Sequence, residues 1–453
     1  MITSELIEMQ KILVLGAGRS ATALINYLLD NSVAYDWKIT VADHDLKLAI
    51  SKIKDHPNGR ATQFDVEDKV LRHELIQDHD MVVSLLPAFL HILVAEDCIE
   101  LKKNLATASY VSKEMKEREA EIKSNGLIFL NEMGLDPGID HMSAMQKIDE
   151  IKAEGGKLTA FYSHTGGLVA PESDTNPWHY KVTWNPRNVV LAGQGVAQYF
   201  ENQTLRLVPY HQLFEQPFMI RVPNMGNYDV YPNRDSISYR TIYQIDEIPS
   251  IMRGTIRHQG YCSSWNLLVQ LGLTDATTIL HDLDQYSHRD LIASITRLEN
   301  NVDLEMNVAK QLNTTIESSE FQNIKWLGLF ENIKVKLNSG TLAEWLESIL
   351  IEKWKLAPQD KDMIIMQHEF HYEIDGMKKI ATSSMIAYGE NSENTAMSRL
   401  VGITLGIGVK LIMLGQIKTK GIILPTSKSI YEPVLKELLD YDVRFRETEM
   451  VLN

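Results

Sequence analysis

A glycine-rich turn near the N-terminus constrains the fold of this chain more than any other feature. An apolar run from Ile12 to Leu15 leads into Gly16-Ala17-Gly18-Arg19-Ser20-Ala21, which has the pattern G-x-G-x-x-A. The first glycine permits a tight turn, the second lets the backbone approach a pyrophosphate, and the small last residue lets a helix pack closely. Free N–H groups at the helix start then favour a negative group. Because a strand precedes this turn and a helix follows it, the pattern predicts a dinucleotide site rather than an ordinary glycine turn.

The N-terminal third of the chain alternates between short β-branched runs and segments with helical periodicity. This alternation is typical of βαβ units in a doubly wound α/β sheet. We expect strands at Lys11–Leu15, Lys38–Ala42, Met81–Leu85, Leu105–Ala108 and Leu127–Leu130, and helices at Arg19–Asp30, Asp45–Lys54, Ile92–Lys102 and Ser112–Ser124.

The pattern changes after Asn131. Residues 157–260 are richer in Pro, Gly, Asn and aromatic residues, and residues 258–350 have mostly helical periodicity. Two long runs, Met363–Ile374 and Met377–Tyr388, flank Asp375-Gly376, which is a strong signal for a β-hairpin. The sequence therefore predicts a nucleotide-binding domain followed by a larger α+β domain.

Composition excludes several classes of function. The chain has 453 residues and a net charge of −15, which argues against nucleic acid or an anionic membrane as partner. Its two cysteines, Cys98 and Cys262, form neither a disulfide framework nor a four-cysteine zinc site. The N-terminus lacks the pattern of a signal peptide, and Leu400–Leu414 is short, glycine-rich and interrupted by Lys410, which favours a buried helix. We expect a cytoplasmic protein.

The end of the second expected strand bears on the choice of dinucleotide. An acid at the position of Asp43 typically bonds the ribose 2′-hydroxyl of NAD and repels the 2′-phosphate of NADP. Neither His44 nor its neighbours supply an arginine for that phosphate. The sequence therefore predicts NAD as the preferred cofactor and NADP as the alternative. A solvated acid beside the helix cap Asp45 would produce the same pattern.

Several polar blocks interleaved with Gly and Pro follow, and they carry a family resemblance. They are Ser109–Ser112, Asn131–His141, Gly166–Glu172, Tyr231–Ser236, Arg253–Arg257 and the Trp-Leu-Gly-Leu-Phe run that begins at Trp326. Through these blocks the chain resembles saccharopine reductase, the glutamate-forming saccharopine dehydrogenase family, over nearly its whole length. Enzymes of this kind reversibly convert saccharopine, water and a nicotinamide cofactor into L-glutamate and 2-aminoadipate 6-semialdehyde.

The resemblance implies a domain plan. A Rossmann-like dinucleotide-binding domain would comprise residues 1–133 and about 392–453. A larger α+β domain, residues 134–391, would bind substrate and form a homodimer, with a small helical region at about 275–360.

The resemblance also implies site residues. Cofactor positions fall on Gly16, Ala17, Gly18, Arg19, Ser20, Asp43, His44, Asp45, Asp65, Val66, Leu85, Ser109, Leu135, Asp136 and Pro137. Substrate positions fall on Ser109, Tyr110, Asp136, Arg234, Thr255, Ile256 and Arg257.

Two departures from the family pattern stand out. NADP-using relatives carry an arginine just after the second strand, where this chain has Asp43-His44. Fungal relatives have Tyr-Cys where this chain has His164-Thr165, so we assign Thr165 no role in proton transfer.

The chemistry of saccharopine suggests roles for some of these residues. Guanidinium groups bind carboxylates through two hydrogen bonds, so we expect Arg234 and Arg257 to hold substrate carboxylates. A surface salt bridge is the alternative for either arginine, and Arg253 competes with Arg257.

Proton transfer at the amine needs a base, for which Asp136, Tyr110 and His164 are candidates. We name Asp136 and Tyr110 as catalytic residues. Asp136 precedes Pro137-Gly138 at an expected helix N-terminus, where the ionised carboxylate is favoured and a simple helix cap is the alternative. We therefore expect Asp136 to orient or pair with the amine, and the base stays unassigned.

No metal site is expected. His368 and His371 are three apart on an expected strand and so face opposite sides of it. Two alternatives to a saccharopine dehydrogenase remain: a related imine-reducing enzyme, such as a carboxyspermidine-type dehydrogenase, and a non-catalytic nucleotide-binding protein, which only Thr165 supports.

Overall fold

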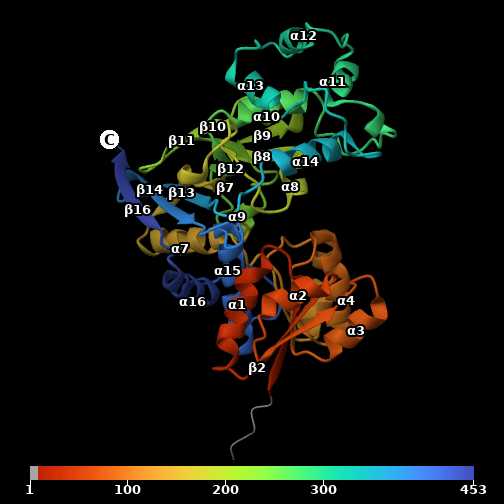
Figure 1. The fold of residues 1–453 in the computed structure, drawn as a ribbon. Helices are drawn as coiled ribbons and strands as arrows, with labels where there is room; N and C mark the ends of the chain where they lie inside the picture. The colour runs from red at the N-terminus through yellow and green to blue at the C-terminus, as the bar shows by residue number, and fades with distance from the viewer. Residues whose placement is uncertain (1–8, 453) are drawn as a thin grey trace, which may run out of the picture. The chain divides into compact units, whose positions relative to one another are not determined.

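The computed structural model describes residues 9–452, and these form two compact units (Figure 1). The first unit comprises the chain up to Ala153 together with Glu393–Arg444. The second comprises Glu154–Ser392 and the C-terminal segment from Phe445.

A parallel sheet of seven strands forms the centre of the first unit, in the order β15-β6-β5-β4-β1-β2-β3. Chain order reverses between β1 and β4, which lie side by side, so this is the doubly wound α/β sheet expected from the sequence. All five predicted strands are present. The strands are β1 (Gln10–Leu15), β2 (Trp37–Asp43), β3 (Gly59–Gln63), β4 (Met81–Ser84), β5 (Asn104–Ala106), β6 (Ile128–Leu130) and β15 (Gly421–Ile423).

Helices accompany these strands along the chain. They are α1 (Ala21–Ser32), α2 (Leu46–Ile53), α3 (Lys69–Gln77), α4 (His91–Glu100), α5 (Lys113–Glu117), α6 (Glu119–Ser124), α7 (Ile139–Ala153), α15 (Ala396–Met413) and α16 (Lys428–Leu438). The single helix predicted over 112–124 is two short helices that meet at Arg118, which ends α5 and precedes α6.

Helix α15 explains the apolar, glycine-rich stretch near the C-terminus. It is long and apolar enough to cross a membrane by length and composition alone, but 72% of it is buried inside the protein. It packs against α1 so closely that a Cβ at Gly402 would lie 2.5 Å from the backbone nitrogen of Leu24. A Cβ at Gly406 would lie 2.4 Å from the ring of Tyr27. The glycines thus allow two helices to approach, and the buried-helix prediction is confirmed.

The second unit is built on a mostly antiparallel sheet in the order β10-β11-β12-β7-β13-β14-β16, with β8 paired to β12 and β9. Its strands are β7 (Lys157–Val169), β8 (Val196–Glu201), β9 (Thr204–Pro209), β10 (Phe218–Val222), β11 (Gly226–Pro232), β12 (Ser250–His258), β13 (Asp362–Ile374), β14 (Met377–Tyr388) and β16 (Arg446–Leu452). The predicted hairpin is confirmed. Asp375 and Gly376 both have positive φ, 51° and 76°. A two-residue turn needs this conformation for its twist to match that of the flanking strands.

The helices of the second unit are α8 (Pro186–Val190), α9 (Tyr239–Ile242), α10 (Tyr261–Gln270), α11 (His288–Thr296), α12 (Leu304–Gln311), α13 (Ser319–Trp326) and α14 (Leu342–Lys353). All of them except α9 contribute buried residues to a separate aromatic core that includes Trp178, Trp265, Trp345 and Trp354.

The unit boundaries differ from the predicted domains in two places. Helix α7 belongs to the first unit rather than the second, because it packs against α16, where the hydroxyl of Tyr431 donates to Asp149 at 2.7 Å. The last strand, β16, belongs to the second unit because it pairs antiparallel with β14. Both differences depend on long-range packing, which sequence periodicity does not reveal.

Candidate functional site

The glycine turn has the geometry that a dinucleotide requires. Gly16 has φ +100°, its N–H donates to the carbonyl of Ala42 at 2.8 Å, and a Cβ there would lie 3.0 Å from the carbonyl oxygen of Leu85. Gly18 is exposed, and a Cβ there would meet nothing within 4 Å. The fold therefore requires glycine at position 16. At Gly18 the fold leaves open space, so that a ligand can approach the backbone there. Ser20 makes no side-chain cap bond, so the start of α1 is free to bind an anion.

Asp43 ties this turn to the end of β2. One carboxylate oxygen accepts the N–H of Ala17 at 2.6 Å, and the other accepts the N–H of Asp45 at 2.9 Å. Asp45 in turn caps α2 by accepting from the N–H groups of Lys47 and Leu48. His44 lies exposed between them. The structure thus places all three residues beside the turn and gives Asp43 a second role, as an acceptor for backbone N–H groups.

The neighbouring strand ends supply the other predicted cofactor positions. Leu85 follows β4, and its N–H donates to the carbonyl of Leu15 at 2.9 Å. Asp65 follows β3 and accepts the N–H of Glu67 at 2.9 Å, while the carbonyl of Val66 accepts from Arg72. The carboxyl ends of adjacent parallel strands therefore meet at one edge, where ligands of doubly wound sheets bind.

A buried histidine holds Ser109 at this edge, and sequence analysis missed it. His91, the first residue of α4, has Nδ1 2.8 Å from the Ser84 hydroxyl and Nε2 2.7 Å from the Ser109 hydroxyl. Burial lowers the pKa of His91 to about 4, so the imidazole is neutral near pH 7. No sequence signal marks His91, because Ser84, His91 and Ser109 come together only when β4 and β5 pair.

The two residues predicted to be catalytic lie together in the first unit. The Tyr110 hydroxyl donates to a carboxylate oxygen of Asp136 at 3.0 Å. Their loops are fixed by Glu132, which accepts the N–H of Val111 at 3.1 Å and lies 2.8 Å from the buried His141.

At the start of helix α7 the acid that binds the backbone is Asp140, not Asp136. Asp140 accepts the N–H of Gly138 at 2.6 Å, just before the first residue of α7. The carboxylate of Asp136, which follows Leu135 and precedes Pro137, faces the hydroxyl of Tyr110. Asp136 is therefore placed to act with Tyr110.

In the second unit, Arg257 lies in an aromatic enclosure. Its guanidinium is 5.1 Å from the ring centre of Tyr180, 5.4 Å from that of Tyr261 and 5.7 Å from that of Tyr231. It donates to the carbonyl of Ile256 at 2.9 Å and makes a long contact of 3.4 Å with the Tyr231 hydroxyl. Arg257 is buried and has no carboxylate partner among the described residues. A surface salt bridge is thus excluded for this arginine.

The other predicted substrate residues lie close to Arg257 along the sheet. Thr255 is two residues earlier on β12, and its hydroxyl donates to Asn233 at 2.6 Å. Arg234 follows Asn233, is exposed, and donates to the carbonyl of Leu191 at 3.3 Å. Ile256 faces the opposite side of the sheet, in an apolar core. Arg253, the competitor, is also buried, over the ring of Tyr239 at 4.0 Å.

His164 and Thr165 are buried on β7 beside this group. His164 Nδ1 and Thr165 Oγ1 have no hydrogen-bond partner. Burial lowers the pKa of His164 to about 4, which makes its neutral imidazole a weak base. Of the three candidate bases, His164 is therefore the least suited.

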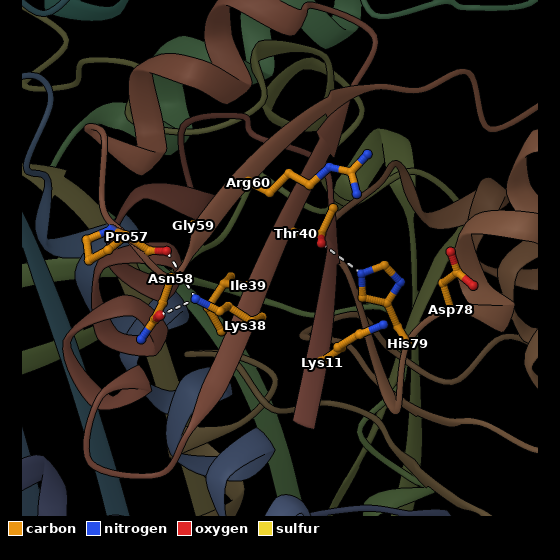
Figure 2. Close-up of a pocket in the computed structure, with 10 residues that line it drawn as sticks. All are labelled: Lys11, Lys38, Ile39, Thr40, Pro57, Asn58, Gly59, Arg60, Asp78 and His79. Atoms are coloured by element: carbon orange, nitrogen blue, oxygen red, sulfur yellow. Dashed lines mark hydrogen bonds between the residues drawn. The ribbon is translucent and has the colours of Figure 1, made fainter. Parts of the chain in front are cut away.

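A separate cavity of about 330 Å³ lies at the amino ends of β1, β2 and β3, away from the glycine turn (Figure 2). Lys38 donates to Asn58 at 2.6 Å, and His79 lies 2.8 Å from the Thr40 hydroxyl. These bonds engage Lys38, Asn58, Thr40 and His79 with one another, and we assign the cavity no ligand.

Comparison with known proteins assigns the N-terminal and C-terminal parts of the chain to domains of one family. Residues 12–130 match the model of the saccharopine dehydrogenase NADP binding domain, and residues 134–443 match that of the saccharopine dehydrogenase C-terminal domain. The chain belongs to the saccharopine dehydrogenase family.

Relatives from fungi are similar over the whole chain. One, from Saccharomyces cerevisiae, is named saccharopine dehydrogenase [NADP(+), L-glutamate-forming]; it is 34% identical, and the match covers 97% of this chain and 99% of the relative. A relative of the same name from Pyricularia oryzae is 32% identical, with 97% and 98% covered. The solved apo saccharopine dehydrogenase (L-Glu forming) from Saccharomyces cerevisiae superimposes with a TM-score of 0.82 at 32% identity, covering 97% of this chain and all of that one.

A more distant structure shares only the fold. The homospermidine synthase from Legionella pneumophila has a TM-score of 0.58 at 10% identity, with 97% of this chain and 91% of that chain covered. The predicted α/β fold class is confirmed. The preference for NAD predicted from Asp43 is not supported, because the matched domain and the fungal relatives are named for NADP.

Proposed function

We propose that this chain is an oxidoreductase that acts on the C–N bond of saccharopine with a nicotinamide dinucleotide and water. The products are L-glutamate and 2-aminoadipate 6-semialdehyde, and the reaction is reversible. The names of the full-length relatives support this substrate. The structural observation that carries the proposal is Arg257, a buried guanidinium with no carboxylate partner in the part of the chain that the structure describes. A buried charge is costly unless it is paired, and a substrate carboxylate would pair it.

The first unit has the features that a dinucleotide needs. Gly18 offers open space that a Cβ would fill, and the uncapped start of α1 supplies N–H groups for a pyrophosphate. When bound, the nicotinamide accepts hydride from the amine-bearing carbon of the substrate. Ser109, held by His91 at 2.7 Å, would contact both cofactor and substrate at this edge.

The second unit supplies the grip on an anionic substrate. Arg257 and its three tyrosines form an enclosure that shields a carboxylate from water and so strengthens the ion pair. Arg234 and Thr255, which are linked through Asn233, would bind a second carboxylate at the more exposed end.

Tyr110 and Asp136 would orient the reacting amine. Asp136 accepts from Tyr110 at 3.0 Å, and its carboxylate would pair with the ammonium group of the substrate. Loss of the ammonium proton must precede hydride transfer, because a protonated amine has no lone pair to stabilise the carbon that gives up hydride. The low pKa of His164 makes it a weak base. The Tyr110–Asp136 pair is therefore the better candidate for positioning the amine as it loses its proton.

For the cofactor we propose NADP. The names of the relatives favour it, and Asp43 already accepts two backbone N–H groups, which compete with a ribose hydroxyl for its oxygens. The test is the ratio of kcat/KM for NADP and NAD in the wild type and in Asp43→Ala. A wild type that strongly prefers NAD, with the preference lost in Asp43→Ala, would overturn the NADP proposal in favour of Asp43 as selector.

The activity itself is tested by incubating the purified chain with saccharopine and each cofactor and following the absorbance of the reduced nicotinamide. We expect turnover that Arg257→Met lowers mainly through a higher KM. Absence of turnover with both cofactors would refute the proposed activity. Faster turnover with an amine that lacks the second carboxylate would indicate the carboxyspermidine type of reaction instead.

A further inference from the structure

Three side chains of the kind that bind metal ions converge in the second unit. They are Asp174 and His179, in the segment that follows β7, and His258, the last residue of β12. One potential ligand atom from each lies within 4.8 Å of the others. The rings of His179 and His258 are stacked with centroids 4.1 Å apart, and Asp174 lies 2.5 Å from Nδ1 of His179.

Local structure explains how the chain brings Asp174 and His179 together. Asn176 accepts the N–H of Trp178 at 3.0 Å and donates to the carbonyl of Tyr180 at 2.8 Å, which folds the segment into a tight turn. Trp178 anchors that turn in the aromatic core. His179 then takes a left-handed conformation, φ 51°, and its side chain returns toward Asp174.

A second observation indicates that this cluster is incomplete by itself. The other carboxylate oxygen of Asp174, Oδ1, is buried and has no hydrogen-bond partner among residues 9–452. A buried oxygen without a partner is costly, so it is normally satisfied by a donor or an ion. His258 is half-buried. Its Nδ1 makes only a long contact of 3.4 Å with the carbonyl of Gln259, and its Nε2 bonds no described residue.

We propose that Asp174, His179 and His258 form a binding site for a divalent transition-metal ion, for which Zn²⁺ is the best fit. Two imidazoles and one carboxylate are a common zinc ligand set, and solvent completes the coordination where a site is partly exposed. Tetrahedral ligands at about 2.0–2.2 Å from zinc lie about 3.4 Å apart. The three side chains must rotate to reach that spacing, and the two stacked imidazole rings must turn so that a nitrogen of each points at the ion.

The position of the site gives the ion a structural role. His179 directly precedes Tyr180, and His258 directly follows Arg257, whose guanidinium lies 5.1 Å from the Tyr180 ring centre. An ion bound to both histidines would connect the turn to the end of β12 and so hold Tyr180 against Arg257. Metal binding itself does not depend on the proposed saccharopine activity.

Another cluster provides a useful contrast. His73, Asp97 and Glu100 in the first unit also have ligand atoms within 4.8 Å of one another. There, however, Asp97 is already paired with the buried Arg72 at 2.6 Å. We therefore expect no ion at this second cluster, and His73→Ala is a matched control.

The test is isothermal titration of the metal-free full-length chain with Zn²⁺ alone. We expect about one zinc ion per chain in the wild type and in His73→Ala, and binding weaker by about tenfold or more in His179→Ala and His258→Ala. Asp174→Asn keeps the shape of the side chain and should also weaken binding. Circular dichroism of the metal-free variants checks that each is folded.

Binding of Co²⁺ tests the same site by an independent, spectroscopic measurement. It should produce visible absorption bands of a nitrogen- and oxygen-ligated ion in the wild type, and these should be lost in His258→Ala. Absence of zinc binding by the wild type would refute the proposal and leave an Asp174–His179 ion pair. Unchanged binding in both histidine variants would also refute it. Neither result bears on saccharopine turnover, so failure here is distinct from failure of the proposed activity.

Discussion

The buried His91 should make the first unit sensitive to mild acid. Burial lowers its pKa from the ordinary 6.5 to about 4. As the pH falls, the unfolded chain binds the proton first, so the folded state loses stability between about pH 6.5 and 4. The full separation of the two pKa values corresponds to about 3.4 kcal/mol, and the interval from pH 7 to pH 5 to about 1.8 kcal/mol.

The perturbation that isolates this effect is His91→Gln. Glutamine retains a donor and an acceptor near Ser84 and Ser109 but does not titrate in this range. His164 also has a pKa of about 4 and lowers wild-type stability over the same interval. The informative quantity is therefore the difference between wild type and variant at the two pH values.

Hydrogen exchange of peptides from β4 and β5 measures the opening free energy of this part of the first unit. Between pH 7 and pH 5 the wild type should lose about 1.8 kcal/mol more than His91→Gln. His44→Gln replaces an exposed histidine of the same unit and serves as the control for a His-to-Gln substitution. Equal losses in wild type and His91→Gln would refute the reasoning, as would a His91 pKa near 6.5 in an NMR titration of the histidine rings.

Three further substitutions test other parts of the first unit. Gly18→Ala should leave the melting temperature nearly unchanged, because its Cβ meets nothing within 4 Å. The same Cβ should contact the pyrophosphate and weaken cofactor binding, measured by fluorescence titration, by about tenfold or more. Unchanged binding would contradict the proposed pyrophosphate site at this turn. Gly402→Ala should destabilise the chain by about 1–3 kcal/mol, because its Cβ would lie 2.5 Å from the Leu24 backbone, and a higher melting temperature would contradict this. Asp97→Ala removes the partner of the buried Arg72, 2.6 Å away, and should cost about 3–5 kcal/mol in urea unfolding; a loss below about 1 kcal/mol would mean that Arg72 finds another partner.

Features that depend on neighbouring residues could be predicted from the sequence alone. The turn at Gly16 and Gly18, the five strands of the N-terminal part and the hairpin at Asp375-Gly376 each follow from local backbone preferences and apolar periodicity. The family blocks located Tyr110 and Asp136, and the structure brings that pair within 3.0 Å. Asp43 lies beside the glycine turn, but the NAD preference predicted from it is not supported, and the sequence does not show that its oxygens accept backbone N–H groups.

Features that depend on distant segments were decided by the tertiary structure. Only strand pairing brings His91 between Ser84 and Ser109, and only the packing of β12 against the turn at Asn176 brings His258 onto His179. The sequence predicted that Arg257 binds a carboxylate, but its burial among tyrosines, which makes an unpaired charge so costly, comes from the fold. Local preferences act over a few residues, whereas the desolvation that sets charge and pKa is produced by side chains that meet only after folding.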